Sequence, residues 1–213
     1  NTLQKQGVTD AAIYALAVGH LDNLSFPEEQ RKPLSLMTAS RLDPRKRLDL
    51  AIRAVALAHE KEPNLYFDIY GKGGEQENLQ ELIDTLGAGD FIQLRGHADL
   101  REVYPQYELY VTASQWETFG LTLMEAVGAG LALVGFDARY GNPTFIKDGK
   151  NGFLVPYSET MDENLLVSQM ADKIVFALES DLESMHQASY DLAKHYLKPE
   201  ILEAWRKLLV AIR

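Results

Sequence analysis

Short, continuously apolar runs alternate along this chain with amphipathic segments of helix length. The expected strands cover residues 13–18, 34–39, 65–70, 91–95, 109–112, 131–135 and 153–155. The expected helices between them cover residues 45–60, 75–86, 100–104 and 121–129. Strands that are apolar throughout and separated by helices are typical of a parallel sheet covered on both faces. The alternation therefore predicts an α/β fold with a doubly wound, Rossmann-like parallel sheet.

The same pattern divides the chain into three stretches. Residues 1–12 are interpreted as the tail of a preceding domain or a linker, and residues 13–163 as the Rossmann-like domain. Residues 164–213 are expected to form only extra C-terminal helices, in which Trp205 belongs to a core or to a docking surface for another domain. Because the chain starts with Asn1 rather than Met, we expect a fragment of a longer protein.

Composition excludes several classes of protein. The net charge of −10 argues against a nucleic-acid-binding surface. Cysteine is absent, which excludes disulfides and thiolate metal sites, and no two histidines have zinc-ligand spacing. No apolar run reaches transmembrane length, and nothing resembles a signal peptide. These features fit a cytoplasmic location, and peripheral attachment to a membrane stays open.

Ligands of doubly wound sheets bind beyond the carboxyl ends of the strands. The segments that follow expected strands in this way are residues 40–46, 71–74, 96–99, 114–120 and 137–142. Candidate binding residues are therefore sought in these five loops.

A basic turn follows the second expected strand. Asp43 is a good N-cap and Pro44 a good first helical residue, so a helix should begin there. Residues 45–47 are all basic and would lie in its first turn, where cations oppose the helix dipole unless an anion is bound. Arg41 could add a bidentate contact to a phosphate. The turn predicts either a phosphate site or an ordinary solvated basic turn.

Two glutamates with seven residues between them, Glu117 and Glu125, form the most informative motif. Glu125 is the only charged side chain between residues 121 and 134, and a desolvated carboxylate needs hydrogen-bond donors. A vicinal diol such as a ribose would supply two donors, and an ion pair with Arg41 or Lys46 is the alternative. Glu117 is expected in a loop just ahead of the helix, so the two carboxylates are not predicted to act as an acid–base pair.

Three weaker features each have a functional and a purely structural interpretation. The glycines of residues 71–74 either admit an anion or form a tight turn, and their spacing matches neither a dinucleotide nor a Walker motif. His97 is either a ligand-binding or a plain loop residue. The polar residues 137–142 suit sugar hydroxyls and a simple turn equally well.

Taken together, these motifs resemble a known family. The relevant residues are Glu117 and Glu125 with Phe119-Gly120, and Ser40-Arg41 followed by Lys46. This combination resembles the carboxy-terminal, donor-binding domain of retaining GT-B glycosyltransferases of the glycogen-synthase-like superfamily, over about residues 13–157. Residues 67–71, 120–126 and 140–142 are similar to the active subunits of two-subunit N-acetylglucosaminyltransferases that modify serine-rich adhesins. Poly(glycerol-phosphate) alpha-glucosyltransferases of teichoic-acid metabolism are also similar.

The resemblance implies a role for each candidate residue. Arg41 and Lys46 would neutralise the diphosphate of a UDP-sugar in place of a metal. Glu125 would bind the ribose, and Glu117 would hold the donor sugar. The other implied donor-binding residues are Ser40, Gly71, Gly96 and His97 (the last two at the uracil), Phe119, Gly120, Leu121, Thr122 and, near the sugar or acceptor, Asn142. Arg41, Lys46 and Glu117 would be the catalytic residues, and no metal or cofactor is implied.

The implied function is transfer of a hexose or N-acetylhexosamine from a UDP-sugar to a protein Ser/Thr or a cell-wall polymer. The partners implied are an N-terminal acceptor domain, missing here, and a homologous partner subunit, and residues 164–213 would pack back toward that domain. The chain alone is expected to bind UDP weakly and transfer nothing. The alternatives are a noncatalytic module of a paired glycosyltransferase and, disfavoured because no G-x-G-x-x-G follows a strand, an NAD-dependent oxidoreductase.

Overall fold

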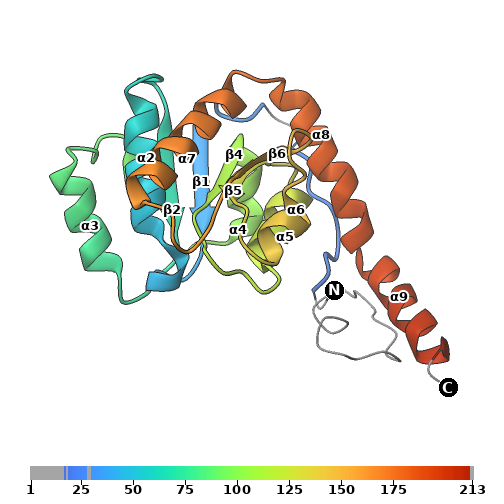
Figure 1. Ribbon diagram of the computed structural model, residues 1–213. Helices are drawn as coiled ribbons and strands as arrows, with labels where there is room; N and C mark the ends of the chain where they lie inside the picture. Colours follow the sequence, from blue (N-terminus) through green and yellow to red (C-terminus); the bar gives the residue numbers. More distant parts are fainter. Residues whose placement is uncertain (1–16, 18, 28–29, 212–213) are drawn as a thin grey trace.

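A single parallel sheet of six strands organises the computed structural model, which describes residues 17, 19–27 and 30–211 (Figure 1). The strands lie in the order β3-β2-β1-β4-β5-β6. Their bounds are Ser35–Ala39 (β1), Tyr66–Tyr70 (β2), Ile92–Gly96 (β3), Leu109–Thr112 (β4), Ala132–Phe136 (β5) and Gly152–Val155 (β6). The prediction of a doubly wound parallel sheet is thereby confirmed. The expected strand at 13–18 and the expected tail at 1–12 lie outside the described residues, apart from Ala17, which is in no strand.

Helices follow most of the strands, as expected. The regular helices are Leu48–His59 (α2), Gln76–Thr85 (α3), Leu100–Val103 (α4), Leu121–Gly128 (α5), Gly141–Phe145 (α6), Glu163–Leu178 (α7), Leu182–Ala193 (α8) and Lys198–Ala211 (α9). The 3-10 turns are Pro44–Lys46 (η1), Tyr104–Gln106 (η2) and Lys194–Tyr196 (η3). The short helix α6 was not expected, because residues 137–142 were interpreted as a loop.

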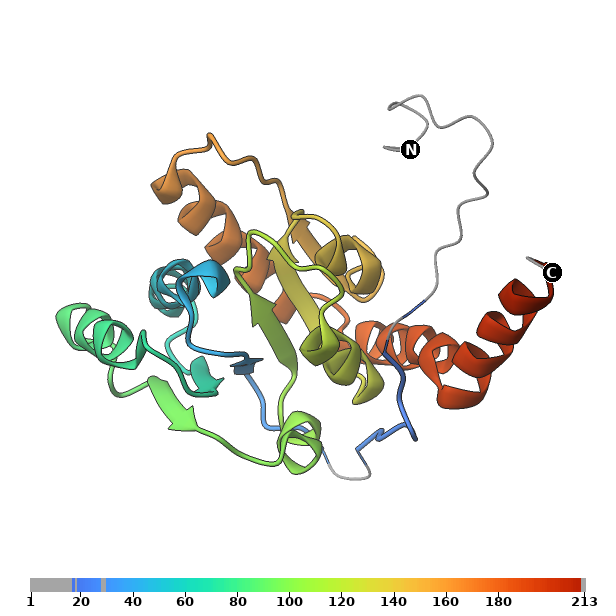
Figure 2. The ribbon, with the colours of Figure 1, turned by 90° about the horizontal axis from the view of Figure 1, so that it is seen from below.

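Helices cover both faces of the sheet (Figure 2), and an apolar core lies on each face. On β1, Leu36 packs on one face with α2, α3 and α7, whereas Met37 packs on the other with α4 and α5. On β4, Val111 and Tyr110 divide between the same two faces. Side chains that are apolar on both faces explain why the strands appear in the sequence as unbroken apolar runs.

The direction of winding reverses between β1 and β4, which are neighbours in the sheet. From β1 the chain proceeds outward to β2 and β3, and from β4 it proceeds the other way to β5 and β6. The loops that follow β1 and β4 therefore diverge at the carboxyl edge of the sheet. In doubly wound folds such a reversal leaves a crevice that binds ligands.

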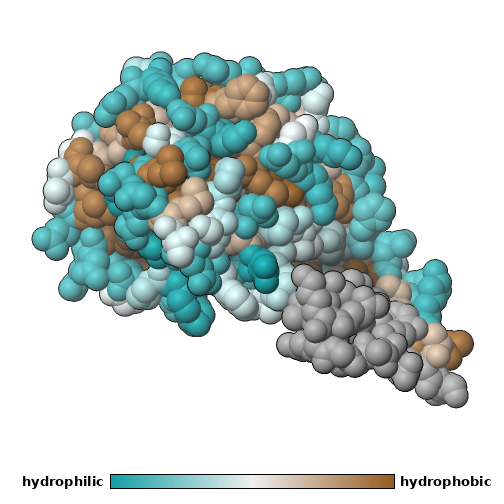
Figure 3. Space-filling model, viewed as in Figure 1, coloured by the Kyte–Doolittle hydropathy of each residue, from teal (hydrophilic) through white to brown (hydrophobic). Residues whose placement is uncertain are grey.

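The last helix, α9, extends away from the sheet (Figure 1). It has no buried residue, and Trp205 is not in a core: its indole Nε1 donates to the Ala17 carbonyl at 3.2 Å. Leu209 and Val210 are exposed near the end of α9, where hydrophobic atoms are visible in Figure 3. None of the described helices is long and apolar enough to cross a membrane.

Candidate functional site

Two adjoining cavities lie at the reversal point between β1 and β4. The outer pocket, of about 330 Å³, is lined by Ala39, Ser40, Arg41, Tyr70, Gly71, Lys72, His97, Ala98, Leu100 and Thr122. The inner pocket, of about 10 Å³, is lined by Thr38, Ala39, Ser40, Lys46, Leu48, Tyr110, Thr112, Ala113, Ser114, Glu117, Thr122 and Leu123. Ala39, Ser40 and Thr122 line both, so the two pockets share a wall at the end of β1.

The basic turn after β1 differs from its prediction. Asp43 caps it as expected, with its carboxylate accepting from the Arg45 backbone N–H at 3.0 Å. The turn is a separate 3-10 turn, however, and it ends at Arg47 in the left-handed conformation (φ 47°) before α2 begins at Leu48. The expectation that three cations lie in the first turn of one helix is therefore wrong.

Carboxylates already neutralise two of these cations. The Arg45 guanidinium binds the Asp43 carboxylate at 2.9 and 2.8 Å, and Arg47 binds Asp49 at 3.0 and 2.9 Å and Glu163 at 2.5 Å. An ordinary basic turn accounts for both residues, without a bound anion. Lys46 is the member of the triplet that lines the inner pocket.

Lys46 and Glu117 meet in the inner pocket. The Lys46 Nζ lies 2.5 Å from Glu117 Oε2, and their side chains are only 21% and 18% exposed. Glu117 is held in place through its backbone, because its N–H donates to Arg139 O and its carbonyl accepts from the N–H groups of Tyr140 and Gly141. The structure thus brings together two predicted catalytic residues that are 71 positions apart.

Arg41 stands apart from this pair. Its side chain is 74% exposed at the outer pocket, and its guanidinium is 3.9 Å from Asp43. An exposed guanidinium at this distance from one carboxylate keeps donors available for a ligand. Arg41 and Lys46 therefore place one cation in each of the two adjoining pockets.

Glu125 has a partner that was not foreseen. It forms no ion pair with Arg41 or Lys46, which bind Asp43 and Glu117 instead, so that alternative is wrong. The Tyr104 hydroxyl donates to Glu125 Oε2 at 3.2 Å. Burial of the Glu125 carboxyl raises its pKa, and the hydrogen bond from Tyr104 opposes this rise. One neutral donor leaves the half-buried carboxylate with capacity for further donors.

Three tyrosines at intervals of three residues, of which Tyr110 lines the inner pocket, hold neighbouring groups through their hydroxyls. The Tyr104 hydroxyl reaches Glu125, and that of Tyr107 donates to the buried Asp68 at 2.5 Å. The Tyr110 hydroxyl donates to Ala39 O at 2.9 Å and bonds the Thr122 hydroxyl at 3.0 Å. These tyrosines were not identified from the sequence as part of the site. Their three-residue spacing is visible in the sequence, and buried tyrosines generally need a partner for the hydroxyl.

Two of the predicted glycines allow close packing of the backbone. Gly71 has φ +137°, and a Cβ there would lie 1.8 Å from the Ser40 carbonyl oxygen. Gly120, with φ +89°, precedes α5, and a Cβ there would press on Leu123 and Glu117. Both positions require glycine for the path of the chain. For residues 71–74 this favours the tight-turn interpretation.

The other predicted residues lie at the pockets, in the core or, for Leu121, at the surface. His97 is exposed and lines the outer pocket, next to Gly96 at the end of β3. The Phe119 ring packs edge-to-face on Phe145, whereas Leu121 is exposed. Asn142 is fully buried, and its amide Nδ2 donates to Ser114 O at 3.2 Å and to Phe136 O at 2.9 Å. Asn142 therefore ties together the chain beyond β4 and β5.

Metal-binding groups are not gathered at this site. Within residues 17, 19–27 and 30–211, no three His, Asp or Glu side chains are arranged to hold a metal ion. Arg41 and Lys72 at the outer pocket and Lys46 at the inner pocket carry positive charges that can compensate a bound anion.

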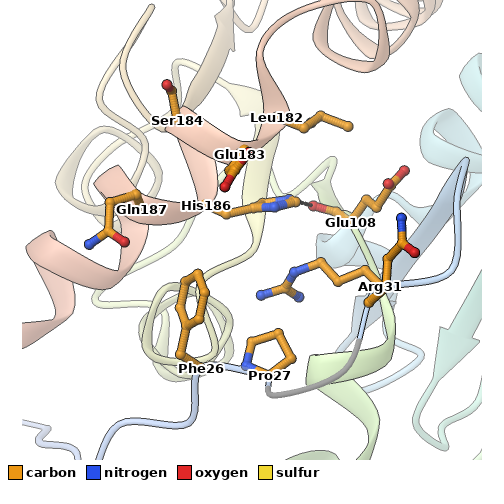
Figure 4. A pocket seen from close by; sticks show the side chains of 10 residues that line it. Phe26, Pro27, Arg31, Glu108, Leu182, Glu183, Ser184, His186 and Gln187 are labelled. Atoms are coloured by element: carbon orange, nitrogen blue, oxygen red, sulfur yellow. Dashed lines mark hydrogen bonds between the residues drawn. The ribbon is translucent and has the colours of Figure 1, made fainter.

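A larger cavity, of about 580 Å³, lies at the opposite, amino edge of the sheet (Figure 4). The Arg31 guanidinium in its wall donates to the carbonyls of Tyr107 (2.6 Å), Ala129 (2.6 Å) and Gly130 (3.2 Å). His186 Nε2 lies 2.9 Å from the Glu108 carbonyl oxygen. The Arg31 and His186 side chains are thus engaged by the chain itself, whereas a ligand of a doubly wound sheet is expected at the crevice of the reversal point.

The model of the family described as "Glycosyl transferases group 1" matches residues 23–191. The chain is 48% identical over 202 residues to the GtfA subunit of the UDP-N-acetylglucosamine–peptide N-acetylglucosaminyltransferase of Streptococcus gordonii, covering 94% of the chain and 40% of that protein. The structure of the pneumococcal O-GlcNAc transferase GtfA in complex with UDP and GlcNAc superposes with TM-score 0.91 at 47% identity, over 99% of this chain and 43% of that one. For a GtfA/B complex the TM-score is 0.88 at 48% identity, over 92% and 39%. The chain thus spans about two fifths of the length of these relatives.

Proposed function

The chain belongs to the group 1 glycosyltransferases, as the resemblance of its motifs implied, and from this membership we propose that it is the donor-binding part of an N-acetylglucosaminyltransferase that uses UDP-N-acetylglucosamine. The single observation that carries the proposal is the contact between Lys46 and Glu117 beside the outer pocket. The contact supports the proposal because it pairs a cation that suits a phosphate with a carboxylate that suits sugar hydroxyls, the two groups needed where a nucleotide-sugar is joined.

The two pockets suggest an orientation for the donor. The uridine would lie in the outer pocket, with uracil toward Gly96 and His97 and the ribose hydroxyls toward Glu125. The diphosphate would pass Arg41 along the shared wall and reach Lys46. The sugar would then contact Glu117. A similar chain was solved with UDP and GlcNAc, which supports this choice of ligand.

The proposed chemistry is transfer with retention of configuration at the anomeric carbon. The bond from that carbon to the β-phosphate oxygen breaks, the acceptor oxygen bonds to the same face, and the departing phosphate takes the acceptor's proton. The developing charge is on the leaving diphosphate, so fixed cations aimed at it lower the barrier. Lys46 and Arg41 would supply them, and Glu117 would hold the sugar and stabilise positive charge on its ring. No metal is required in this scheme.

The remaining parts of the enzyme belong to the proposal as well. The acceptor would be a protein serine or threonine, presented by an N-terminal domain outside this chain. A homologous subunit would assist, by analogy with the GtfA/B complex. The reaction would take place in the cytoplasm, in keeping with the absence of cysteine.

Calorimetric titration of the 213-residue chain tests donor binding. We expect UDP to bind, Glu125→Ala to abolish detectable binding and Lys46→Ala to weaken it. Lys61→Ala is the matched control, because Lys61 also pairs with a carboxylate (Asp172, 2.8 Å) but follows the last turn of α2 and lines neither pocket. Binding of NAD instead of UDP, or of neither, would contradict the proposal.

Transfer is tested in the enzyme joined to the N-terminal portion that its relatives have. Lys46→Ala should lower kcat by about 100-fold or more, the size expected when one electrostatic stabiliser of a leaving group is removed, and Lys61→Ala should leave kcat unchanged. Mass spectrometry of the products from mixed UDP-sugars and from peptide and polyol-phosphate acceptors identifies both substrates. An unchanged kcat in Lys46→Ala would refute the leaving-group role.

A further inference from the structure

The carboxylate of Glu125 is held from one side by a buried hydroxyl. Tyr104 is 3% exposed and begins η2, 21 positions before Glu125 in the chain. Its hydroxyl lies 3.2 Å from Glu125 Oε2 and 3.2 Å from the Thr122 carbonyl oxygen, so its single proton is shared between these two acceptors. Among the described residues, Tyr104 provides the hydrogen bond that Glu125 accepts through its side chain.

Tyr104 is well suited to be a permanent donor. Burial raises the pKa of its phenol well above the usual value, and the charge of Tyr110 or Glu125 would disfavour the phenolate further. The ring is fixed by packing in the core on this face, with its centroid 6.2 Å from that of Tyr110. A rigid ring with a protonated hydroxyl can hold an acceptor in one position.

This contact is made to one oxygen, Oε2, and Glu125 is only half buried. A carboxylate has about four acceptor positions, so most of its capacity remains for a ligand. Two adjacent hydroxyls of a ribose would supply donors for these positions. The same hydroxyl also contacts the first turn of α5 at Thr122, which lines both pockets.

We propose that Tyr104 is a positioning residue that orients Glu125 to bind the vicinal diol of a nucleotide ribose, so that it contributes to selection of ribonucleotides. The inference rests on the proposed function, because it assumes that Glu125 faces a ribose. Tyr104 itself touches no ligand in this scheme and acts through the carboxylate.

The test compares UDP with 2′,3′-dideoxyuridine diphosphate, which lacks both ribose hydroxyls, by calorimetry on the 213-residue chain. Tyr104→Phe keeps the packed ring and removes the hydroxyl. It should weaken UDP binding about tenfold, the size expected for a hydrogen bond to a charged group, and leave binding of the dideoxy compound unchanged. In a Glu125→Gln background, Tyr104→Phe should cause no further loss for UDP.

Tyr66→Phe is the matched control. Its phenol oxygen is buried and has no hydrogen-bond partner among the described residues, so removing it should change neither affinity. Equal losses for the two ligands in Tyr104→Phe, or losses that add in the double variant, would show a purely structural role and overturn the inference. If Tyr104→Phe fails to fold, Tyr104→His and Tyr104→Leu are compared: the preference for UDP over the dideoxy compound must fall more in Tyr104→Leu, which has no donor, and an equal fall overturns the inference. Failure of the wild-type chain to bind UDP would instead refute the proposed function.

Discussion

The stability of the domain should depend on pH through His186. This residue of α8 is 8% exposed, and its Nε2 lies 2.9 Å from the Glu108 carbonyl oxygen at the amino edge of the sheet (Figure 4). Burial of the imidazole, and next the positive charge of Arg31, lower its pKa from 6.5 to about 4. The perturbation to apply is acidification, with His186→Gln as the variant that cannot titrate.

Whether acid stabilises or destabilises the domain depends on whether the folded or the unfolded chain binds the proton of His186 more tightly. Above pH 6.5 His186 is neutral in both states and adds no pH dependence. Between pH 6.5 and about 4 the unfolded chain takes up a proton that the folded chain does not, so the free energy of unfolding falls as the pH is lowered. The gap between the two pKa values corresponds to a loss of about 3 kcal/mol, which is complete below pH 4.

Urea unfolding at several pH values between 7 and 4.5, followed by circular dichroism, measures this loss. At pH 5 the wild-type chain should have lost about 2 kcal/mol through this residue, and His186→Gln should lack that part of the slope. If wild type and His186→Gln lose stability in parallel between pH 7 and pH 5, the reasoning is refuted.

Two further substitutions test the packing around the pockets. Gly71→Ala should lower the free energy of unfolding by about 3 kcal/mol or more and weaken UDP binding, because the new Cβ would collide with the Ser40 carbonyl oxygen at a positive φ. Thermal melts measure the first effect and calorimetry the second. An unchanged Tm would contradict the steric account. Arg31→Met should cost about 3 kcal/mol in urea unfolding, since it leaves buried carbonyls at Tyr107, Ala129 and Gly130 without their donor, and a loss below about 1 kcal/mol would show that water replaces the guanidinium.

The strands were predictable because both faces of the sheet are covered. Runs such as Leu109–Thr112 are buried along their whole length, so their apolar character is visible in the sequence. Helix ends were less predictable. Asp43 and Pro44 indicated a helix start correctly, but the left-handed Arg47 that separates η1 from α2 is not a residue type that signals such a break. The helix α6 was missed because Gly141 and its neighbours have the composition of a turn.

The contacts of the candidate site were only partly predictable. Local patterns identified Lys46, Glu117 and Glu125 as unusual, each from its own surroundings. Which of them would pair depended on the order of the strands, because β1 and β4 bring the loops at Lys46 and Glu117 together. The hydrogen bond from Tyr104 to Glu125 had no signature, since the two residues lie on different elements and no periodicity connects them.

The contact between Lys46 and Glu117 also has a consequence for how dissolved salt would affect a bound diphosphate. In the chain without ligand the ammonium group is already matched by a carboxylate at 2.5 Å. A diphosphate would replace one anionic neighbour of Lys46 with another, and dissolved ions weaken both attractions. The two effects of ionic strength therefore partly cancel. Donor affinity should decline with added salt less steeply than the charge of the diphosphate alone would suggest.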